Sequence, residues 1–333
     1  MKAHPRHPHQ QLLVLPDDGV GSIVELIDQA EEQLLVKQFK LQSDTILTSL
    51  IRATERGVTV RVMLNPRTSG GDRWNDSAFK RLESLGIAVA WSCDAFHVTH
   101  EKSIVIDGHS VLIATFNLAD KHFGDTRDYG VVSQDPRVVS QVVAGFDADW
   151  SRRVFQPDLN LGLLWSSGHS RRPIATLIDS ATTTLWLQHP KFADAVVMER
   201  ILAARDRGVK VRVLCGGKHG LRPWDLLDTM ASLRTLARFG VKVRRQRHLK
   251  LHAKLILVDG KVAQTGSMNI DRSAFDLRRE LGIESDSPPV VSRLLETFQS
   301  DWSQASRYHP PDPLGPSCEE DGELPDDPHF VHD

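Results

Sequence analysis

The chain has 333 residues, about twice the usual domain size, so its length predicts two domains or one large one. Its 41 Lys and Arg against 43 Asp and Glu give a formal net charge of −2, which excludes a basic nucleic-acid coat protein and an acidic disordered chain. No apolar run reaches the roughly 18–20 residues that span a bilayer, so we expect neither a transmembrane segment nor a signal peptide. Cys93, Cys215 and Cys318 show no close spacing, which disfavours a disulfide scaffold and favours a cytoplasmic protein.

Helices and strands alternate along the chain. Apolar residues at helical spacing begin at Ile23, and a second such stripe begins at Ile46 and ends before Gly57, a residue typical of a helix C-cap. The runs rich in Val, Ile and Leu predict strands at residues 34–39, 58–64, 87–91, 103–107 and 111–114. This order indicates an α/β unit with a largely buried sheet.

The chain contains this unit twice. The segment RGVTVRVML at residues 56–64 recurs as RGVKVRVLC at residues 207–215, and Asp149-Trp150 recurs as Asp301-Trp302, at offsets of 151 and 152 residues. Such a constant offset indicates a duplication. The predicted organisation is a flexible N-terminus (1–19), a first lobe (20–152), a connector (153–171), a second lobe (172–305) and an acidic disordered tail (306–333).

The pattern H-x-K-x4-D occurs once in each copy. It comprises His100, Lys102 and Asp107 in the first copy, and His252, Lys254 and Asp259 in the second. Each pattern opens a predicted strand, and alternation along an extended chain places the histidine and the lysine on one face. Two copies of a three-residue pattern at one offset favour a functional site over structural histidines.

Polar residues recur downstream of each pattern. A hydroxyl and a carboxamide follow the next strand, where they could donate to phosphate oxygens, and an acidic residue stands 28 residues beyond each histidine. We expect this acid to bind the second nitrogen of the imidazole and orient it; an ordinary surface ion pair is the alternative. The residues are Thr115, Asn117 and Asp128 in the first copy, and Ser267, Asn269 and Glu280 in the second.

Together these motifs resemble the phospholipase D superfamily from about residue 20 to residue 305. The stretch GSMNIDRSAFDLRRE at residues 266–280 resembles the second half of bacterial cardiolipin synthases, although this sequence shows no transmembrane helix. The first copy departs from the family pattern at Ala114-Thr115, where Gly-Ser is usual, and at Asp128, where Glu is commoner. Neither departure removes a functional group.

The resemblance implies two pseudo-symmetric lobes, each a mixed β-sheet flanked by helices, with one active site at the lobe interface. It implies a phosphohistidine intermediate with His100 as the nucleophile and His252 as the general acid and base, while Lys102 and Lys254 neutralise the phosphate. Asp107 and Asp259 are expected to brace the site. No metal and no other cofactor is expected, and the closely spaced His4, His7 and His9 are interpreted as surface histidines.

Three functions remain open from the sequence. The first is a metal-independent phosphodiesterase that cleaves phospholipids or, like a cardiolipin synthase, transfers their phosphatidyl group, with a peripheral contact to the membrane. The second is a nuclease of the same superfamily, and the third is a non-catalytic phosphate-binding scaffold. The basic run Arg244–Lys250 could bind phosphates of lipid or nucleic acid, or could be a solvated strand edge.

Overall fold

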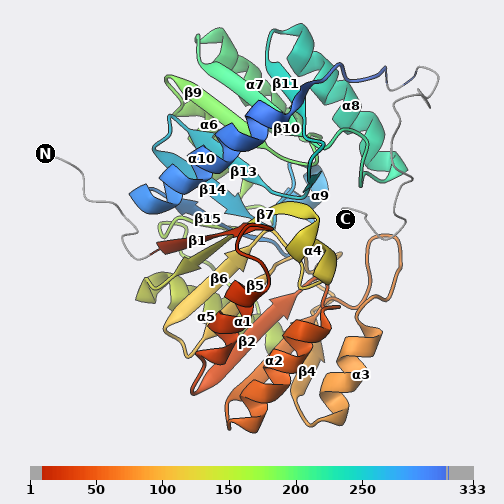
Figure 1. The fold of residues 1–333 in the computed structure, drawn as a ribbon, viewed down its shortest axis with the longest axis vertical. Helices are drawn as coiled ribbons and strands as arrows, with labels where there is room; N and C mark the ends of the chain where they lie inside the picture. The colour runs from red at the N-terminus through yellow and green to blue at the C-terminus, as the bar shows by residue number, and fades with distance from the viewer. Residues whose placement is uncertain (1–9, 313, 315–333) are drawn as a thin grey trace, which may run out of the picture.

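The protein consists of two lobes stacked along its long axis (Figure 1). The structure is a computed structural model and describes residues 10–312 and residue 314. Each lobe is built on a mixed β-sheet with helices packed against it, and each sheet has eight strands. The predicted α/β fold with two similar lobes is therefore confirmed. Residues 1–9, with the three N-terminal histidines, and most of the predicted acidic tail lie outside the described residues.

The sheet of the first lobe has the strand order β1-β7-β6-β5-β2-β3-β4. Parallel pairing joins β2, β3 and β4, and antiparallel pairing joins the others. Seven of its eight strands come from the first half: β1 (Gln10–Leu15), β2 (Gln33–Gln38), β3 (Thr59–Leu64), β4 (Ala88–Trp91), β5 (Ser103–Ile106), β6 (Ser110–Ala114) and β7 (Thr126–Ser133).

The sheet of the second lobe repeats this arrangement, with the order β16-β11-β10-β9-β13-β14-β15-β8. One short strand of this half, β12 (Lys250–Leu251), crosses over and pairs with β7 of the first sheet. The other strands are β8 (Leu163–Trp165), β9 (Thr184–Gln188), β10 (Lys210–Cys215), β11 (Lys242–Arg245), β13 (Leu255–Val258), β14 (Val262–Gly266), β15 (Leu281–Ser285) and β16 (Ser306–Arg307).

Each half contributes five helices among the described residues. Those of the first half are α1 (Gly21–Asp28), α2 (Asp44–Glu55), α3 (Asp76–Ser84), α4 (Asp120–Gly124) and α5 (Pro136–Trp150). Those of the second half are α6 (Arg171–Asp179), α7 (Ala195–Asp206), α8 (Pro223–Arg238), α9 (Arg272–Asp276) and α10 (Pro288–Gln304). None of these helices is both long enough and apolar enough to cross a membrane.

The same local signals start and end equivalent helices in the two lobes. Ser43 caps α2 by accepting from the amide of Ile46, and Asp194 caps α7 by accepting from the amide of Val197. Beyond the other ends, Gly57 and Gly208 have φ values of 93° and 89°, a conformation that glycine adopts at low cost. The duplicated sequence thus specifies duplicated helix boundaries.

The predicted boundaries of the repeat need correction. Residues 10–15, assigned to a flexible N-terminus, form β1, whose residues are buried except Gln11 and which lies between β7 and α10. Residues 163–165, assigned to the connector, form β8 at the edge of the second sheet. Residues 306–307, assigned to the tail, pair with β11. These strands of six residues or fewer gain their stability from neighbours distant in sequence, which local periodicity does not reveal.

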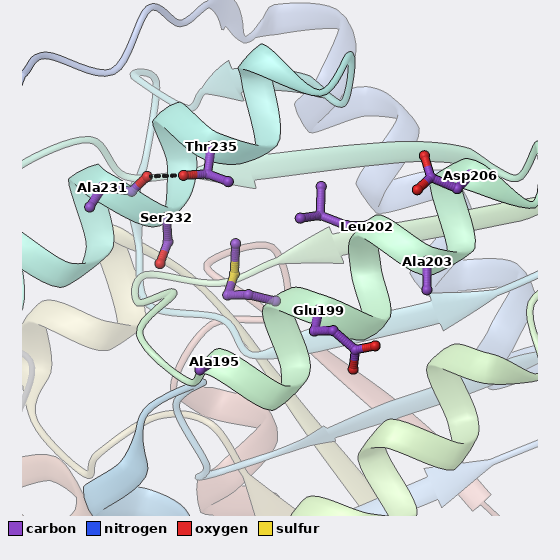
Figure 2. Close-up of a pocket in the computed structure, with 9 residues that line it drawn as sticks. Ala195, Glu199, Leu202, Ala203, Asp206, Ala231, Ser232 and Thr235 are labelled. Carbon is purple, nitrogen blue, oxygen red and sulfur yellow. Dashed lines mark hydrogen bonds between the residues drawn. The ribbon is translucent and has the colours of Figure 1, made fainter.

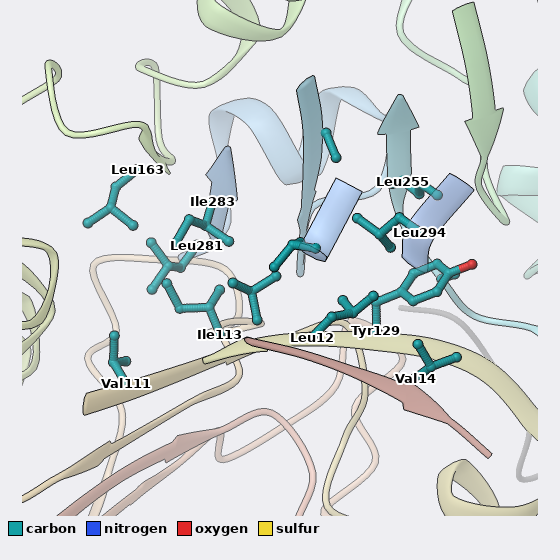
Figure 3. Packing of buried hydrophobic residues seen from close by; sticks show 14 of the residues in the cluster. Leu12, Val14, Val111, Ile113, Tyr129, Leu163, Leu255, Leu281, Ile283 and Leu294 are labelled. Carbon is teal, nitrogen blue, oxygen red and sulfur yellow. The ribbon is translucent and has the colours of Figure 1, made fainter. Parts of the chain in front are cut away.

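The two lobes share a hydrophobic core. Side chains from the sheets of both halves pack together with those of α5 and α10, among them Val111, Ile113 and Tyr129 of the first lobe and Leu255, Leu281 and Ile283 of the second (Figure 3). One further cluster lies beneath the outer helices of each lobe. Because the central cluster draws on both halves, neither lobe has a complete core without the other.

Candidate active site

The two histidines lie next to the opposite lobe. The backbone amide of His100 donates to the carbonyl of Arg279 at 2.8 Å, and that of His252 donates to the carbonyl of Arg127 at 3.2 Å. Each histidine stands in an extended segment just before its strand, β5 or β13, as the sequence analysis predicted. Both side chains are almost fully buried, with exposures of 2 % and 4 %.

The predicted acids bind the imidazoles, but each acid binds the histidine of the other lobe. Glu280 lies 2.9 Å from Nδ1 of His100, and Asp128 lies 2.7 Å from Nδ1 of His252. The equal spacing of 28 residues within each copy had suggested pairs inside one lobe, and this interpretation was wrong. In both pairs Nδ1 is occupied by a carboxylate, which leaves Nε2 for a substrate.

Two buried arginines, which the sequence analysis did not single out, explain the exchange. Arg127 binds Asp301 of the second lobe at 2.9 Å, and Arg279 binds Asp149 of the first lobe at 2.9 Å. Each arginine directly precedes the acid that reaches across, so its ion pair fixes that acid against the opposite histidine. The repeated Asp-Trp landmark was the signal that could have revealed these residues.

The buried Lys37 supports the pair formed by Arg279 and Asp149. Lys37 binds Asp149 at 2.7 Å and Glu101 at 3.1 Å, and all three side chains lie beneath the His100 segment. In the second lobe Gln188, the partner of Leu255 in the sheet, occupies the place that Lys37 has in the first, and it donates to Asp301 at 2.8 Å. The arrangement of polar side chains behind each histidine is therefore repeated, but the neutral Gln188 stands where the first lobe has the charged Lys37.

The two lysines of the motifs are fully buried beside their histidines. Nζ of Lys102 donates to the carbonyl of His100 at 2.5 Å, and Nζ of Lys254 donates to that of His252 at 2.6 Å. Nζ of Lys254 also lies 3.3 Å from Nε2 of His252. The two ammonium groups are thus held beside the imidazoles, where an anionic phosphate would need positive charge.

The predicted hydroxyl groups have a different task from the one expected. Thr115 donates to Asp128 at 2.5 Å and accepts from the amide of Tyr129. Ser267 bonds with the carbonyl and the amide of Leu281, directly after Glu280. Because both hydroxyls already bind the strand or carboxylate behind the histidines, they position the acids and are not aimed at a phosphate.

Besides His252, Asp128 binds the imidazole of His122, a residue that the sequence analysis missed. Nδ1 of His122 lies 3.1 Å from the carboxylate of Asp128, and its ring centroid lies 4.4 Å from that of His252. Thr126 donates to the same carboxylate at 2.5 Å. The position equivalent to His122 in the second copy is Ala274, so a search for repeated residues does not find this histidine.

The predicted carboxamides lie in the same region. Asn117 and Asn269 are buried, with exposures of 6 % and 1 %. The amide nitrogen of Asn117 lies 3.3 Å from Nε2 of His122, and its Oδ1 has no partner among the described residues. Both residues follow the strand next to a catalytic segment, so they remain candidates for contact with a phosphate.

Asp107 and Asp259 lie at the other end of their strands. The carboxylate of Asp107 accepts from the amides of Glu31, Glu32 and Gln33, at 2.8–2.9 Å. Asp259 does the same for the segment Thr182–Thr184. Five residues of extended chain span roughly 16 Å, so these acids are too far from the lysines to take part in chemistry. They hold the start of β2 and of β9, so they brace the sheets and are not catalytic residues.

The two half-sites differ in electrostatics. Burial and the charge of Lys102 lower the pKa of His100 well below its usual value. Burial also lowers the pKa of His252, but there the charge of Asp128 opposes the shift. Burial raises the pKa of Glu280 to about 7. For Asp128 the effect of burial is overcome by His252 and by hydrogen bonds, which hold its pKa well below the usual range.

Burial lowers the pKa values of both lysines as well. That of Lys254 falls to about 8, where Asp128 and Glu280 oppose the shift, and that of Lys102 falls well below its usual value. The mutual repulsion of the two ammonium groups contributes to the shift of Lys102. An anion bound between them would relieve this repulsion.

One group of side chains has the composition of a metal site. His122, Asp128 and His252 bring ligand atoms within 4.8 Å of one another. However, Nδ1 of both histidines is already hydrogen-bonded to the carboxylate of Asp128, which also accepts from two threonines. These contacts fit an acid that orients imidazoles better than one that binds a cation.

Two other features lie at least partly at the surface. The basic run turns partly inward, since Arg244 stacks on Trp302 and Arg245 is buried, which leaves Arg247 and His248 exposed. A surface hollow lies between α7 and α8 and holds none of the predicted site residues (Figure 2). It is lined by Ala195, Met198, Glu199, Leu202, Ala203, Asp206, Ala231, Ser232 and Thr235.

Comparison with known families identifies the fold and the motifs. The family described as "Cardiolipin synthase, PLD-like domain" matches residues 23–150 and 174–302. The chain belongs to this phospholipase D-like family. The matched segments contain both H-x-K patterns and both acids, and this assignment confirms the resemblance that the sequence indicated.

Similar proteins carry related names. The chain is 25 % identical to cardiolipin synthases of Oceanobacillus iheyensis and Staphylococcus aureus, with alignments covering 86 % and 87 % of this chain. It spans about two thirds of their length, 67 % and 65 %.

Solved structures agree in fold. Phosphatidylserine synthase of Haemophilus influenzae superposes with a TM-score of 0.72 at 16 % identity, covering 90 % of this chain and 87 % of that one. Polyphosphate kinase of Porphyromonas gingivalis superposes with a TM-score of 0.70 at 16 % identity, covering 90 % and 48 %.

Proposed function

We propose that the protein transfers the phosphatidyl group of a phospholipid to an alcohol through a phosphohistidine, in the manner of a cardiolipin synthase. The observation that carries this proposal is the pair of buried histidines, each bound through Nδ1 to a carboxylate of the other lobe and flanked by a lysine. The names of its relatives favour transfer over hydrolysis. The predicted emphasis on lipid degradation is accordingly replaced by lipid synthesis.

His100 is proposed as the nucleophile. A nucleophilic imidazole must be neutral, and both burial and the nearby cations favour the neutral form of His100. Burial lowers the pKa of His252 as well, but Asp128 opposes this shift, which favours His252 over His100 as the proton donor. The difference in electrostatics supports the same division of roles that the family resemblance implied.

The proposed reaction has two steps. In the first, Nε2 of His100 attacks phosphorus, the bond to the leaving alcohol breaks, and His252 donates its proton to the departing oxygen. In the second, His252 removes the proton of the incoming alcohol, whose oxygen attacks phosphorus and displaces His100. Lys102 and Lys254 neutralise the phosphate, and Asn117 and Asn269 are proposed to donate hydrogen bonds to its oxygens.

The test is a transfer assay with phosphatidylglycerol vesicles, with and without excess chelator. We expect a diphosphatidyl product in the wild type under both conditions, and none in His100→Ala or His252→Ala. His109→Ala serves as a control, since His109 lies exposed in the turn after β5. Release of phosphatidic acid alone would reassign the protein as a hydrolase, and loss of activity with chelator would overturn the metal-independent reaction.

We further propose that the start of α8 contacts the membrane surface. Trp224 and Leu227, one turn apart at the start of this helix, are 56 % and 47 % exposed. The segment before them reaches the first lobe, where Arg222 binds Asp72 at 3.2 Å. Exposed aromatic and aliphatic side chains beside basic residues are typical of contact with an anionic bilayer.

The first-lobe loop that contains Asp72, the partner of Arg222, begins beside the His100 segment. Asn65, directly after β3, accepts from the amide of Thr99, the residue before His100. Sedimentation with phosphatidylglycerol vesicles tests the contact. Trp224→Ser should weaken binding by roughly 10-fold, because a side chain of this size loses its burial in lipid. Phe239→Ser is the matched control, since Phe239 is equally exposed at 56 % but caps the far end of α8. Equal losses in both variants would refute the proposed surface.

A further inference from the structure

Arg278 is a buried cation that forms no direct ion pair within the described residues, although its charge favours the ionised form of Glu280, two residues further on. Its side chain is 4 % exposed, and it forms no ion pair with any residue that the structure describes. Nε donates to Ser273 at 2.9 Å, and Nη2 donates to Ser69 of the first lobe at 3.4 Å. Nη1 has no hydrogen-bond partner within the described part of the chain.

The other buried arginines at the interface are neutralised. Arg127 is paired with Asp301, and Arg279, the residue next to Arg278, is paired with Asp149. Burying a guanidinium with an unused donor costs free energy, and a bound anion would offset that cost. Arg278 is therefore poised for a ligand that the chain itself does not supply.

The position of Arg278 points to the reacting phosphate. It lies two residues before Glu280, and its positive charge lowers the pKa values of His100, Lys102 and Lys254. The contacts of the next two residues agree with this position, because the carbonyl of Arg279 accepts from the amide of His100 and Glu280 binds the His100 imidazole. A guanidinium also remains protonated at any pH at which the chain is folded, whereas the two lysines lose part of their basicity on burial.

Only one half of the duplication carries this arginine. The equivalent position, 152 residues earlier, is Thr126, whose hydroxyl donates to the carboxylate of Asp128. The arginine therefore adds a positive charge to the His100 side, where its planar group could bind two phosphate oxygens at once.

We propose that Arg278 is a third phosphate-binding cation of the active site, which holds the reacting phosphodiester beside His100 through Nη1. This inference deepens the proposed function, since it concerns the phosphate of the same substrate. Ser273 and Ser69 orient the guanidinium from the two lobes, so its position depends on the contact between the lobes.

Anion binding tests the proposal separately from catalysis. Titration calorimetry with inorganic phosphate should show binding to the wild type and roughly 10- to 100-fold weaker binding to Arg278→Gln, the expected loss for a charged hydrogen bond. Arg278→Lys, which keeps the charge but not the planar fork, should lose less. Arg272→Gln is the matched control, because Arg272 lies six residues earlier with an exposure of 87 %.

The outcomes separate the two proposals. If Arg278→Gln keeps its melting temperature and binds phosphate as tightly as the wild type, the role of Arg278 is refuted, whatever the enzyme does. If phosphate binding falls but the wild type shows no transfer, Arg278 stands and the proposed reaction fails. With an active wild type, we expect the KM for phosphatidylglycerol to rise and kcat to fall in Arg278→Gln, and Arg278→Lys to recover part of both.

Discussion

The two half-sites share one frame and differ in what surrounds each histidine. In both, the histidine amide binds a carbonyl of the other lobe, and Nδ1 binds a carboxylate of that lobe. Around His100, the ring of Phe39 lies 4.8 Å away, and Arg278 adds positive charge. Around His252, a second imidazole and two threonine hydroxyls share the carboxylate of Asp128.

This difference shows how the two halves of a duplicated chain can take different roles in one reaction, nucleophile in one half and general acid and base in the other. Two identical imidazoles in identical surroundings would have equal pKa values, and neither would be committed to acid or nucleophile. Cations beside His100 favour its neutral form, whereas the carboxylate of Asp128 opposes the lowering of the pKa of His252. Each lobe supplies the acid that orients the histidine of the other lobe. Both half-sites therefore depend on the association of the lobes.

The largest expected effect separates the roles of the histidines. With a p-nitrophenyl phosphodiester, whose leaving group needs no proton, His252→Ala should still release up to one equivalent of p-nitrophenolate in a burst and then stop. His100→Ala should show no burst, because no phosphohistidine forms. Stopped-flow absorbance measures the burst, and the overall turnover of both variants should fall by at least ~10³-fold. A burst from His100→Ala but not from His252→Ala would reverse the assignment.

A smaller effect is expected when the acids are made neutral. Asp128→Asn should reduce kcat by roughly 10- to 100-fold, since the carboxylate orients both His252 and His122. Glu280→Gln should cost less, because the pKa of Glu280, raised by burial to about 7, leaves part of this group protonated in the wild type. Steady-state kinetics at pH 7 compare the two variants, with the exposed Asp125→Asn as control. A larger loss for Glu280→Gln would contradict the proposed asymmetry.

Repetition located most of this site, although the repeated Arg127 and Arg279 were missed together with the unrepeated residues. The offset near 152 located the histidines, lysines, asparagines and acids, because each occurs twice. His122 and Arg278 have no counterpart in the other copy, so the same offset could not reveal them. Runs rich in Val, Ile and Leu also located the central strands, which are buried on both faces, but they did not reveal β1, β8 and β16.

Contacts between lobes were the other gap. Spacing within a copy shows that an acid follows a histidine, but it does not show which histidine the acid reaches. That choice is made by Arg127 and Arg279, whose ion pairs cross between the lobes. The length of β5 did contain one usable signal, because Asp107 stands at its far end and extended chain cannot return it to the site.

The smallest expected effect concerns stability. Burial raises the pKa of Glu280 to about 7, above the 4.5 of an exposed glutamate, so the folded protein binds the proton more tightly than the unfolded chain. The stabilisation from this protonated group is complete below pH 4.5 and is lost as the pH rises toward 7. Glu280→Gln removes the loss, so its melting temperature relative to the wild type should rise between pH 5 and pH 8. Each kcal/mol corresponds to roughly 2–4 °C in a chain of this kind.

Asp128→Asn provides the contrast in the same calorimetric experiment. The pKa of Asp128 is held well below its usual 3.8 in the folded protein, so its contribution to stability is complete above that value and is lost only in acid. Its melting temperature relative to the wild type should therefore stay constant between pH 5 and pH 8. Parallel shifts in the two variants would show that the carboxylates share one environment, and the division between the half-sites would then have to rest on Arg278 and His122 alone.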